Sequence, residues 1–405
     1  MSKHLTRRAA LAGTAGIALA LPAIRRARAA EPIRLGMTTA LTGPFNEFGE
    51  GIHRGAVLAI EAANAAGGVL GRPVELGVLL DDQLVPDRAV QNMRRILDDA
   101  SIVAIYGPSG SGPTLAIIDM MQADGRPFVN TQAQTPAIVY PNGLDKPPRP
   151  NVFSVATQND VEMTILGTTV AAKYSDIGIM TESTGYGVTG TALLKEAIAK
   201  ARPDAKVAAE TYNQRTQDVT AQLARIRNAG AKVLIVVGLG ADLALIRKNM
   251  ARMNVSLQIY GTSGSMSLPY EEGAGKLVVG SRSAQLRSLR EEPLRPAVQA
   301  FEAQYKAKYG TDRWWGDNPE QPLISLGDLV GPGFDATLVM LDAIGRAKST
   351  DPKAVIEAMD TTKNLPGVRA IYSFTPARHH AVLADDLAIY EFVEEDGKVT
   401  RKPAG

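Results

Sequence analysis

The stretch IVAIYGPSGSGPT, residues 102–114, combines the local patterns that decide the fold. Its first five residues are apolar and rich in β-branched side chains, which predicts a buried strand. A turn of small residues follows and lets the backbone approach a ligand closely. Pro113 suits the first turn of a helix, and the apolar run after it predicts that helix. Together they predict an anion site, because the amides and dipole at a helix N-terminus favour a carboxylate or phosphate.

Ser111 lies two residues before this proline and allows two interpretations. A serine near a helix start is a common N-cap, whose side chain accepts a hydrogen bond from a free backbone amide. The same hydroxyl could instead bind an anionic ligand. Gly110 and Gly112 flank Ser111 without side chains, so the neighbouring backbone stays open to a ligand.

Strands and helices alternate on both sides of this stretch. The first series ends at a proline-rich segment, residues 141–150, which suggests a boundary before a second series begins. The predicted strands are 33–37, 74–80, 102–106, 127–130, 152–155, 176–180, 206–210, 232–237 and 258–260, and the predicted helices are 52–66, 88–98, 115–124, 161–174, 190–201, 218–229 and 242–253. Such alternation is typical of α/β folds with doubly wound, mainly parallel sheets, and two series predict two lobes.

The last third of the chain has a different pattern. Helices are predicted at 293–309, 334–347 and 351–359, and a polar loop between the first two holds Trp314 and Trp315. Residues 371–374 and 387–393 are predicted to form two antiparallel strands near the end. Periodicity leaves open which lobe these helices complete.

Composition restricts the function class. A chain of 405 residues favours two domains, and 45% hydrophobic with 21% charged residues is ordinary for a globular protein. Because the net charge is +2 and no basic stretch is interleaved with aromatic residues, we expect no nucleic-acid partner. The absence of cysteine excludes disulfides, thiolate metal sites and a lipid-anchored N-terminal cysteine.

The first 29 residues have the features of an export signal. Lys3, Arg7 and Arg8 precede a short apolar region, and residues 27–29 (Ala-Arg-Ala) supply the small residues of a cleavage site. The paired arginines indicate a twin-arginine (Tat) signal over residues 1–29. No other segment reaches 18 apolar residues, so we expect no membrane insertion and a mature protein free in the periplasm.

Enzyme motifs are absent from the sequence. The turn GPSGSG is not GxGxxG and lacks the lysine of a P-loop. The four histidines show no metal-ligand spacing, and His53 alone is more typical of a surface or capping residue than of a base. We therefore expect a binding protein without cofactor or metal, and an exported α/β enzyme remains a remote alternative.

Five separate motifs resemble one known family. They are residues 60–73 (IEAANAAGGVLGRP), Thr42-Gly43-Pro44 with Phe48-Gly49, residues 107–114, Tyr186-Gly187, and Phe334-Asp335-Ala336. In this order they resemble type I periplasmic binding proteins of the branched-chain amino-acid (leucine/isoleucine/valine) class, the receptors of ABC importers. The resemblance covers the whole mature chain.

This resemblance implies two Rossmann-like lobes joined by three crossovers, with the ligand clamped in the cleft between them. By similarity, residues 30–154 and 282–368 form the N-terminal lobe, and residues 155–281 and 369–405 form the C-terminal lobe. It also implies closure of the lobes about a hinge, ABC permease subunits as partners and a monomeric state. A sensor that presents its closed form to a receptor ectodomain remains an alternative.

The resemblance also implies the site residues. Ser111 matches the serine that binds the ligand carboxylate, and Gln132 and Gln134 replace the small residues and threonine usual in the family. Tyr186, Phe48 and Phe334 match aromatics of the cleft, and Gly110 and Gly112 belong to the carboxylate-binding turn.

Asp242 is the one acidic residue available to neutralise a ligand ammonium, although a helix N-cap is an equally good role for it. If Asp242 faces away from the cleft, an aromatic or aliphatic carboxylate without an ammonium suits the site. Trp314 and Trp315 either add to the apolar walls or pack on the surface.

Overall fold

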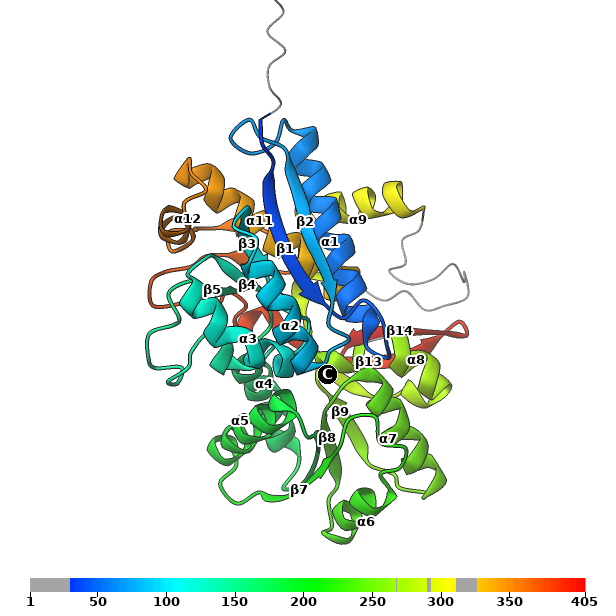
Figure 1. Cartoon of the computed structure of the whole chain (residues 1–405). Coiled ribbons are helices and arrows are strands. Elements are labelled where there is room, and N and C mark those ends of the chain that lie inside the picture. Colours follow the sequence, from blue (N-terminus) through cyan, green and yellow to red (C-terminus); the bar gives the residue numbers. More distant parts are fainter. Residues whose placement is uncertain (1–29, 267, 290–292, 311–325, 405) are drawn as a thin grey trace, which may run out of the picture.

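The computed structural model describes residues 30–404, apart from 267, 290–292 and 311–325. The predicted signal peptide and Trp314 and Trp315 lie outside the described residues. The described chain forms two α/β lobes, which are the upper and lower halves of Figure 1.

A five-stranded parallel sheet forms the first lobe, in the order β2-β1-β3-β4-β5. One face is covered by α1 and α11, with α9 and α12 beside them, and the other by α2 and α3 (Figure 1). Residues of β1 alternate between these two layers, because Ile33, Leu35 and Met37 pack toward α1 and α11. The strands are β1 (Ile33–Thr39), β2 (Val74–Asp81), β3 (Ile102–Tyr106), β4 (Phe128–Asn130) and β5 (Val152–Ser154), and the helices are α1 (Asn46–Ala65), α2 (Pro86–Leu97), α3 (Ser111–Asp124), α9 (Pro296–Tyr309), α10 (Leu326–Leu329), α11 (Gly331–Ala347) and α12 (Pro352–Met359).

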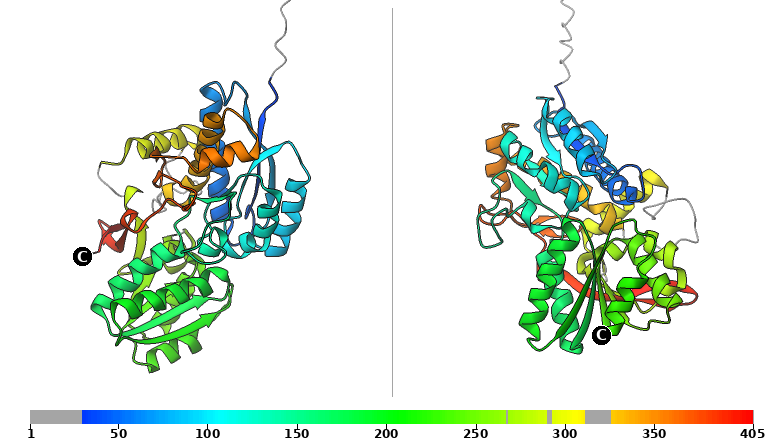
Figure 2. Two further views of the ribbon diagram at one scale, coloured as in Figure 1. Left: turned by 90° about the vertical axis from the view of Figure 1, so that its left-hand side faces the viewer. Right: turned by 60° about the horizontal axis from the view of Figure 1, so that its bottom comes forward.

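A seven-stranded mixed sheet forms the second lobe, in the order β14-β13-β10-β9-β8-β6-β7. Helices α4 and α5 cover one face, and α6, α7 and α8 cover the other (Figure 2). The strands are β6 (Asp176–Glu182), β7 (Lys206–Tyr212), β8 (Val233–Val237), β9 (Gln258–Gly261), β10 (Arg282–Leu286), β13 (Leu387–Glu395) and β14 (Lys398–Pro403), and the helices are α4 (Asn159–Lys173), α5 (Gly185–Ala201), α6 (Thr220–Asn228), α7 (Gly240–Arg252) and α8 (Leu268–Ala274). The parallel part of this sheet and the first sheet together confirm the predicted doubly wound class.

The chain crosses between the lobes three times, and two of the expected boundaries are wrong. Because β10 pairs with β9 and β13, residues 282–286 belong to the second lobe, and the expected change at residue 282 is too early. The expected change at residue 369 is also too early. Phe374 and Val382 pack in the core of the first lobe, and His380 pairs with Ser154 at the edge of its sheet. The third crossover therefore falls just before β13.

Two expectations from local pattern are corrected as well. Residues 371–374 and 387–393 do not pair with each other, since β12 (Ile371–Tyr372) pairs with β11 (Leu365–Pro366) and β13 pairs with β10 and β14. The proline-rich segment 141–150 is not a boundary, because β5 follows it and still pairs with β4. Prolines end regular structure locally but do not decide which sheet receives the next strand.

Arg369, in the first lobe, ties the first and second crossovers together. Its guanidinium donates to the carbonyl of Val155 at 2.9 Å and to the Thr157 hydroxyl at 3.3 Å, both on the first crossover. Its own carbonyl accepts a hydrogen bond of 2.5 Å from the Ser288 hydroxyl on the second. Arg369 is 3% exposed, so these bonds are shielded from water.

Asp335, at the start of α11, fixes the backbone around Arg369. One carboxylate oxygen accepts from the amide of Val368 at 2.7 Å, and the other accepts from the amide of Arg369 at 2.8 Å and the Tyr372 hydroxyl at 2.7 Å. Asp335 is fully buried, and this burial raises its pKa against the lowering effect of the three bonds. The hinge region is thus held by buried polar contacts.

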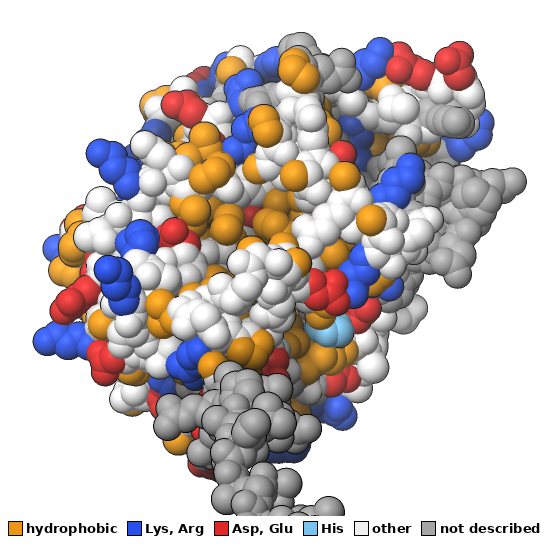
Figure 3. Space-filling model, turned by 90° about the horizontal axis from the view of Figure 1, so that it is seen from above, with side chains coloured by type: hydrophobic (Ala, Val, Ile, Leu, Met, Phe, Trp, Pro, Cys, Tyr) orange, Lys and Arg blue, Asp and Glu red, His pale blue; other side chains and the backbone are white. Residues whose placement is uncertain are grey.

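On the face that Figure 3 displays, Lys and Arg side chains lie among Asp and Glu side chains, mostly toward the edge, and hydrophobic side chains gather near the centre. Within residues 30–404 as described, no helix is both long and apolar enough to cross a membrane.

Candidate ligand site between the lobes

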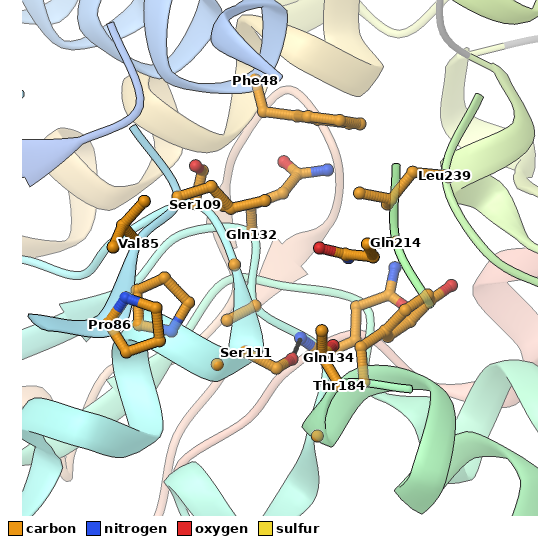
Figure 4. Close-up of a pocket in the computed structure, with 18 of the residues that line it drawn as sticks. Phe48, Val85, Pro86, Ser109, Ser111, Gln132, Gln134, Thr184, Gln214 and Leu239 are labelled. Carbon is orange, nitrogen blue, oxygen red and sulfur yellow. Dashed lines mark hydrogen bonds between the residues drawn. The ribbon is translucent and has the colours of Figure 1, made fainter. Parts of the chain in front are cut away.

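A cavity of about 520 Å³ lies between the two lobes. Both lobes line it: Phe48, Leu84, Val85, Pro86, Ser109, Gly110, Ser111, Gly112, Pro113, Gln132, Ala133 and Gln134 come from the first, and Thr184, Gly185, Tyr186, Gln214, Arg215, Leu239 and Gly264 come from the second. Figure 4 shows the labelled side chains gathered around this space. Its size falls within the usual range for small-molecule sites.

The walls of the cavity follow the carboxyl ends of parallel strands. Residues 84–86 follow β2, 109–113 follow β3, 132–134 follow β4, 184–186 follow β6, 214–215 follow β7, Leu239 follows β8 and Gly264 follows β9. Open α/β sheets bind ligands at this edge, where the strand order reverses and the loops diverge. The site is therefore built by the topology of the two sheets.

Ser111 lies at the first position of α3, and Gly110 is the N-cap residue. The Ser111 hydroxyl oxygen does not cap its own helix; it accepts hydrogen bonds of 3.2 Å from the amides of Gln134 and Thr135 in the loop after β4. With both acceptor positions used, the hydroxyl proton is left to point at a ligand. The interpretation of Ser111 as an N-cap is therefore wrong.

Several buried polar atoms at the cavity have no partner among the described residues. They are the hydroxyls of Ser109 and Tyr186 and the side-chain oxygens of Gln132 and Gln134. Ser109 and Gln134 are 6% and 7% exposed. Figure 4 shows the Gln132 amide between Phe48 and Gln214. Buried polar groups are normally hydrogen-bonded, so these atoms mark places where a ligand or water binds.

Gly110 and Gly112 leave the start of α3 open. A Cβ on Gly110 would lie 2.5 Å from Cδ1 of Leu84, whereas a Cβ on Gly112 would meet only Pro86, at 3.9 Å. Leu84 itself has a left-handed backbone (φ 59°), as has Gln83 before it (φ 52°). Two successive non-glycine residues in this conformation are costly, and such strain is found preferentially at functional sites.

The aromatic walls are Phe48 and Tyr186. Phe48, from α1, is 6% exposed, and Tyr186, in the first turn of α5, is 8% exposed. Burial, together with the nearby carboxylate of Glu162, raises the pKa of Tyr186 far above its usual value. Its side chain is thus a neutral phenol at physiological pH.

Two predicted site residues do not line the cavity. Phe334 packs edge-on against Phe301 with ring centroids 5.2 Å apart, because the first turn of α11 is pressed onto α1. A Cβ on Gly333 would lie 1.8 Å from the carbonyl oxygen of Ile52, so the helices touch here, and the partly buried Phe334 ring packs against the core of the first lobe.

Asp242 is the second predicted site residue that does not line the cavity. It lies in the first turn of α7, is 4% exposed and is not among the cavity-lining residues. Burial and the neighbouring Glu182 raise the pKa of Asp242 to about 6, whereas a hydrogen bond from the Arg215 backbone lowers it. No cation is among the causes of this shift, and one oxygen of Asp242 has no hydrogen-bond partner among the described residues.

Sequence reasoning missed part of the site, including Leu84, Gln214 and Arg215. Local motifs do not distinguish these residues. Their shared signal is position, since each follows the last residue of a strand by two or three residues. Ligands of open α/β sheets bind at the carboxyl ends of the strands, and this principle, applied to every strand, would have predicted the loops after β2 and β7 as part of the site.

No group of three or more His, Asp or Glu side chains in the described residues could hold a metal ion. The cavity contains one charged lining residue, Arg215, whose guanidinium also lies 5.4 Å from the ring centroid of Phe45 in the other lobe. What the arrangement offers is hydrogen bonding, apolar contact and positive charge.

Comparison with known proteins gives one consistent result. The sequence model of the periplasmic binding protein family matches residues 32–398. The leucine-, isoleucine-, valine-, threonine- and alanine-binding protein of Pseudomonas aeruginosa is 24% identical over 335 residues, which are 82% of this chain and 83% of that protein. The Leu/Ile/Val-binding protein homolog 7 of Brucella melitensis is 27% identical over 92% of this chain and 90% of its own length.

Solved structures agree with this result. The crystal structure of a type 1 periplasmic binding protein from Bordetella pertussis is 47% identical, with a TM-score of 0.88 over 92% of this chain and 100% of that chain. The isoleucine complex of LivJ from Streptococcus pneumoniae shares the fold, with a TM-score of 0.75 and 19% identity over 92% of this chain and 99% of that one. The chain therefore belongs to the type I periplasmic binding proteins and is a relative of their leucine/isoleucine/valine-binding class.

Proposed function

We propose that this protein is a periplasmic solute receptor of an ABC importer, which closes on a small carboxylate-bearing ligand and delivers it to a membrane permease. One observation carries the proposal: the cavity lies between two lobes that already touch across it. Gln134 in the first lobe donates to the Ser263 hydroxyl in the second at 2.9 Å, and the Thr135 hydroxyl donates to the Gly185 carbonyl at 3.1 Å.

The binding order follows from this geometry. The ligand carboxylate binds first to the Ser111 hydroxyl and the free amides at the start of α3, where the helix dipole favours an anion. The second lobe then brings Tyr186 and Leu239 onto the ligand. Gln134 takes part in both steps, because its oxygen faces the cavity and its nitrogen bonds to Ser263.

Closure is a shift between open and closed forms that exist without ligand. The ligand stabilises the closed form relative to the open form by the difference between its binding free energies for the two forms. A permease that recognises the closed arrangement of the two lobes then distinguishes loaded from empty receptor. Binding, and not catalysis, is the function that these contacts supply.

The test is a thermal-unfolding screen of the mature protein, refolded from denaturant so that carried-over ligand is removed. The panel pairs amino acids with aromatic and aliphatic carboxylates. A compound present at 100 times its dissociation constant should stabilise the folded protein by about 2.7 kcal/mol. Addition of this compound together with the receptor should also increase ATP hydrolysis by the ABC importer proposed as its partner, reconstituted in liposomes. A binding compound that leaves ATP hydrolysis unchanged would contradict the transport role.

A further inference from the structure

The residues that line the cavity carry charge of one sign. Among the described residues that line it, Arg215 alone carries a charge, and the first turn of α3 adds the positive end of a helix dipole. Ser109, whose hydroxyl has no partner and which is 6% exposed, lies at the same end of the cavity. These groups favour an anion.

The nearby carboxylates are directed elsewhere. Glu182 accepts hydrogen bonds from the amide and hydroxyl of Thr184 and from the amide of Gly187, and so holds the start of α5. One oxygen of Glu162 accepts from the amide of Ser263, and its other oxygen has no partner among the described residues. Asp242 is 4% exposed and does not line the cavity, and one of its oxygens also has no partner among the described residues. Among the described residues that line the cavity there is thus no carboxylate.

This arrangement has a direct consequence for the ligand. An ammonium group enclosed here would lose its water without gaining an anionic partner, which is strongly unfavourable. A carboxylate would meet the Ser111 hydroxyl, the α3 amides and the field of Arg215. The amides of Gln132 and Gln134 can bind uncharged polar groups such as a hydroxyl.

We propose that the ligand is a carboxylate without an ammonium group, carrying an apolar aromatic or branched aliphatic body that fills the space between Phe48, Leu84 and Leu239. This inference rests on the proposed function and names the ligand class of the same site. The cavity of about 520 Å³ and its apolar walls fit such a body. The protein thus differs in ligand class from the amino-acid binders to which it is similar.

The experiment uses matched pairs that differ only in the ammonium group. L-phenylalanine is compared with 3-phenylpropanoate, and L-leucine with 4-methylpentanoate, by calorimetric titration of the refolded mature protein. At least one of the compounds without an ammonium should bind at least 100-fold more tightly than its amino acid. The methyl ester of 3-phenylpropanoate, which lacks the carboxylate charge, should not bind.

The variant Asp242→Asn separates the outcomes. Binding of the compounds without an ammonium should be unchanged by it, because Asp242 does not reach them. Amino acids that bind as tightly as their partners, and lose this binding in Asp242→Asn, would overturn the inference and leave the proposed carboxylate receptor intact. An ester that binds as well as its acid, or a panel in which no carboxylate binds, would contradict the proposed function itself.

Discussion

Replacing Ser111 by alanine removes the acceptor of two buried amides. The Gln134 and Thr135 amides lie 3.2 Å from the Ser111 hydroxyl oxygen, and these residues are 7% and 1% exposed. Ser111→Ala leaves both amides without this partner. A buried, unsatisfied amide costs about 1–3 kcal/mol. Because the bonds are long and water can enter from the cavity, we expect the lower part of that range for each, about 2–3 kcal/mol in total.

Ser109→Ala is the matched control. Ser109 lines the same cavity two residues away, but its hydroxyl has no partner among the described residues. Removing this hydroxyl should leave stability unchanged or raise it slightly, because an unsatisfied buried group is lost. The free energy of unfolding of wild type and both variants is measured in urea without ligand, with circular dichroism as the readout.

The two variants should differ clearly in the urea midpoint. Ser111→Ala should unfold at lower urea with an unchanged m-value, and Ser109→Ala should follow the wild type. If Ser111→Ala is within about 0.5 kcal/mol of the wild type, the two amide bonds contribute little and the reasoning is refuted. Such a result would also remove the argument that the hydroxyl proton is left for a ligand.

Three further predictions concern the hinge and the packing of the first lobe. Burial raises the pKa of Glu162 to about 7 from 4.5, so the folded protein keeps this proton longer than the unfolded chain. As pH rises from 4.5 to 7, the free energy of unfolding of the wild type should therefore fall by up to about 3 kcal/mol relative to that of Glu162→Gln. If urea unfolding gives the two proteins the same dependence on pH, this prediction is contradicted. Asp335→Asn should destabilise by about 3 kcal/mol in urea, because an amide cannot accept from all three donors, and a midpoint like that of the wild type would refute it. Gly333→Ala should lower stability by about 1–3 kcal/mol or more, because the added Cβ collides with α1. Gly345→Ala in the same helix, where a Cβ meets nothing within 4 Å, should raise stability by about 0.5–1 kcal/mol. Equal thermal unfolding midpoints for these two variants would refute both expectations.

The predicted alternation of strands and helices is confirmed because it depends on local periodicity. The buried strand at residues 102–106 and the helix after it could be predicted from hydrophobic pattern and from Pro113 alone. The crossovers could not, because strand pairing joins residues far apart in sequence. The placement of β10 beside β9 and β13 depends on a sheet that the last residues of the chain complete.

The site could be predicted where a motif carries it. Ser111, Gly110 and Gly112 lie at the cavity because the strand–turn–helix motif fixes their position. Phe334 and Asp242 do not line the cavity, which the sequence could not show, because the position of a residue in a helix does not tell which way its side chain faces. The contact of Gly333 with α1 and the burial of α7 decide this, and both are tertiary. Arg215 was missed because its loop after β7 has no motif of its own.

The central claim is that a bound carboxylate closes the two lobes, and a distance measurement between the lobes tests it directly. The chain contains no cysteine, so spin labels attached through Asp87→Cys on α2 and Lys248→Cys on α7, both exposed positions, are unique. Pulsed electron paramagnetic resonance measures their separation with and without the carboxylate that binds most tightly in the matched panel. A shorter and narrower distance distribution with the carboxylate is expected. The same distribution with and without bound carboxylate would contradict the account.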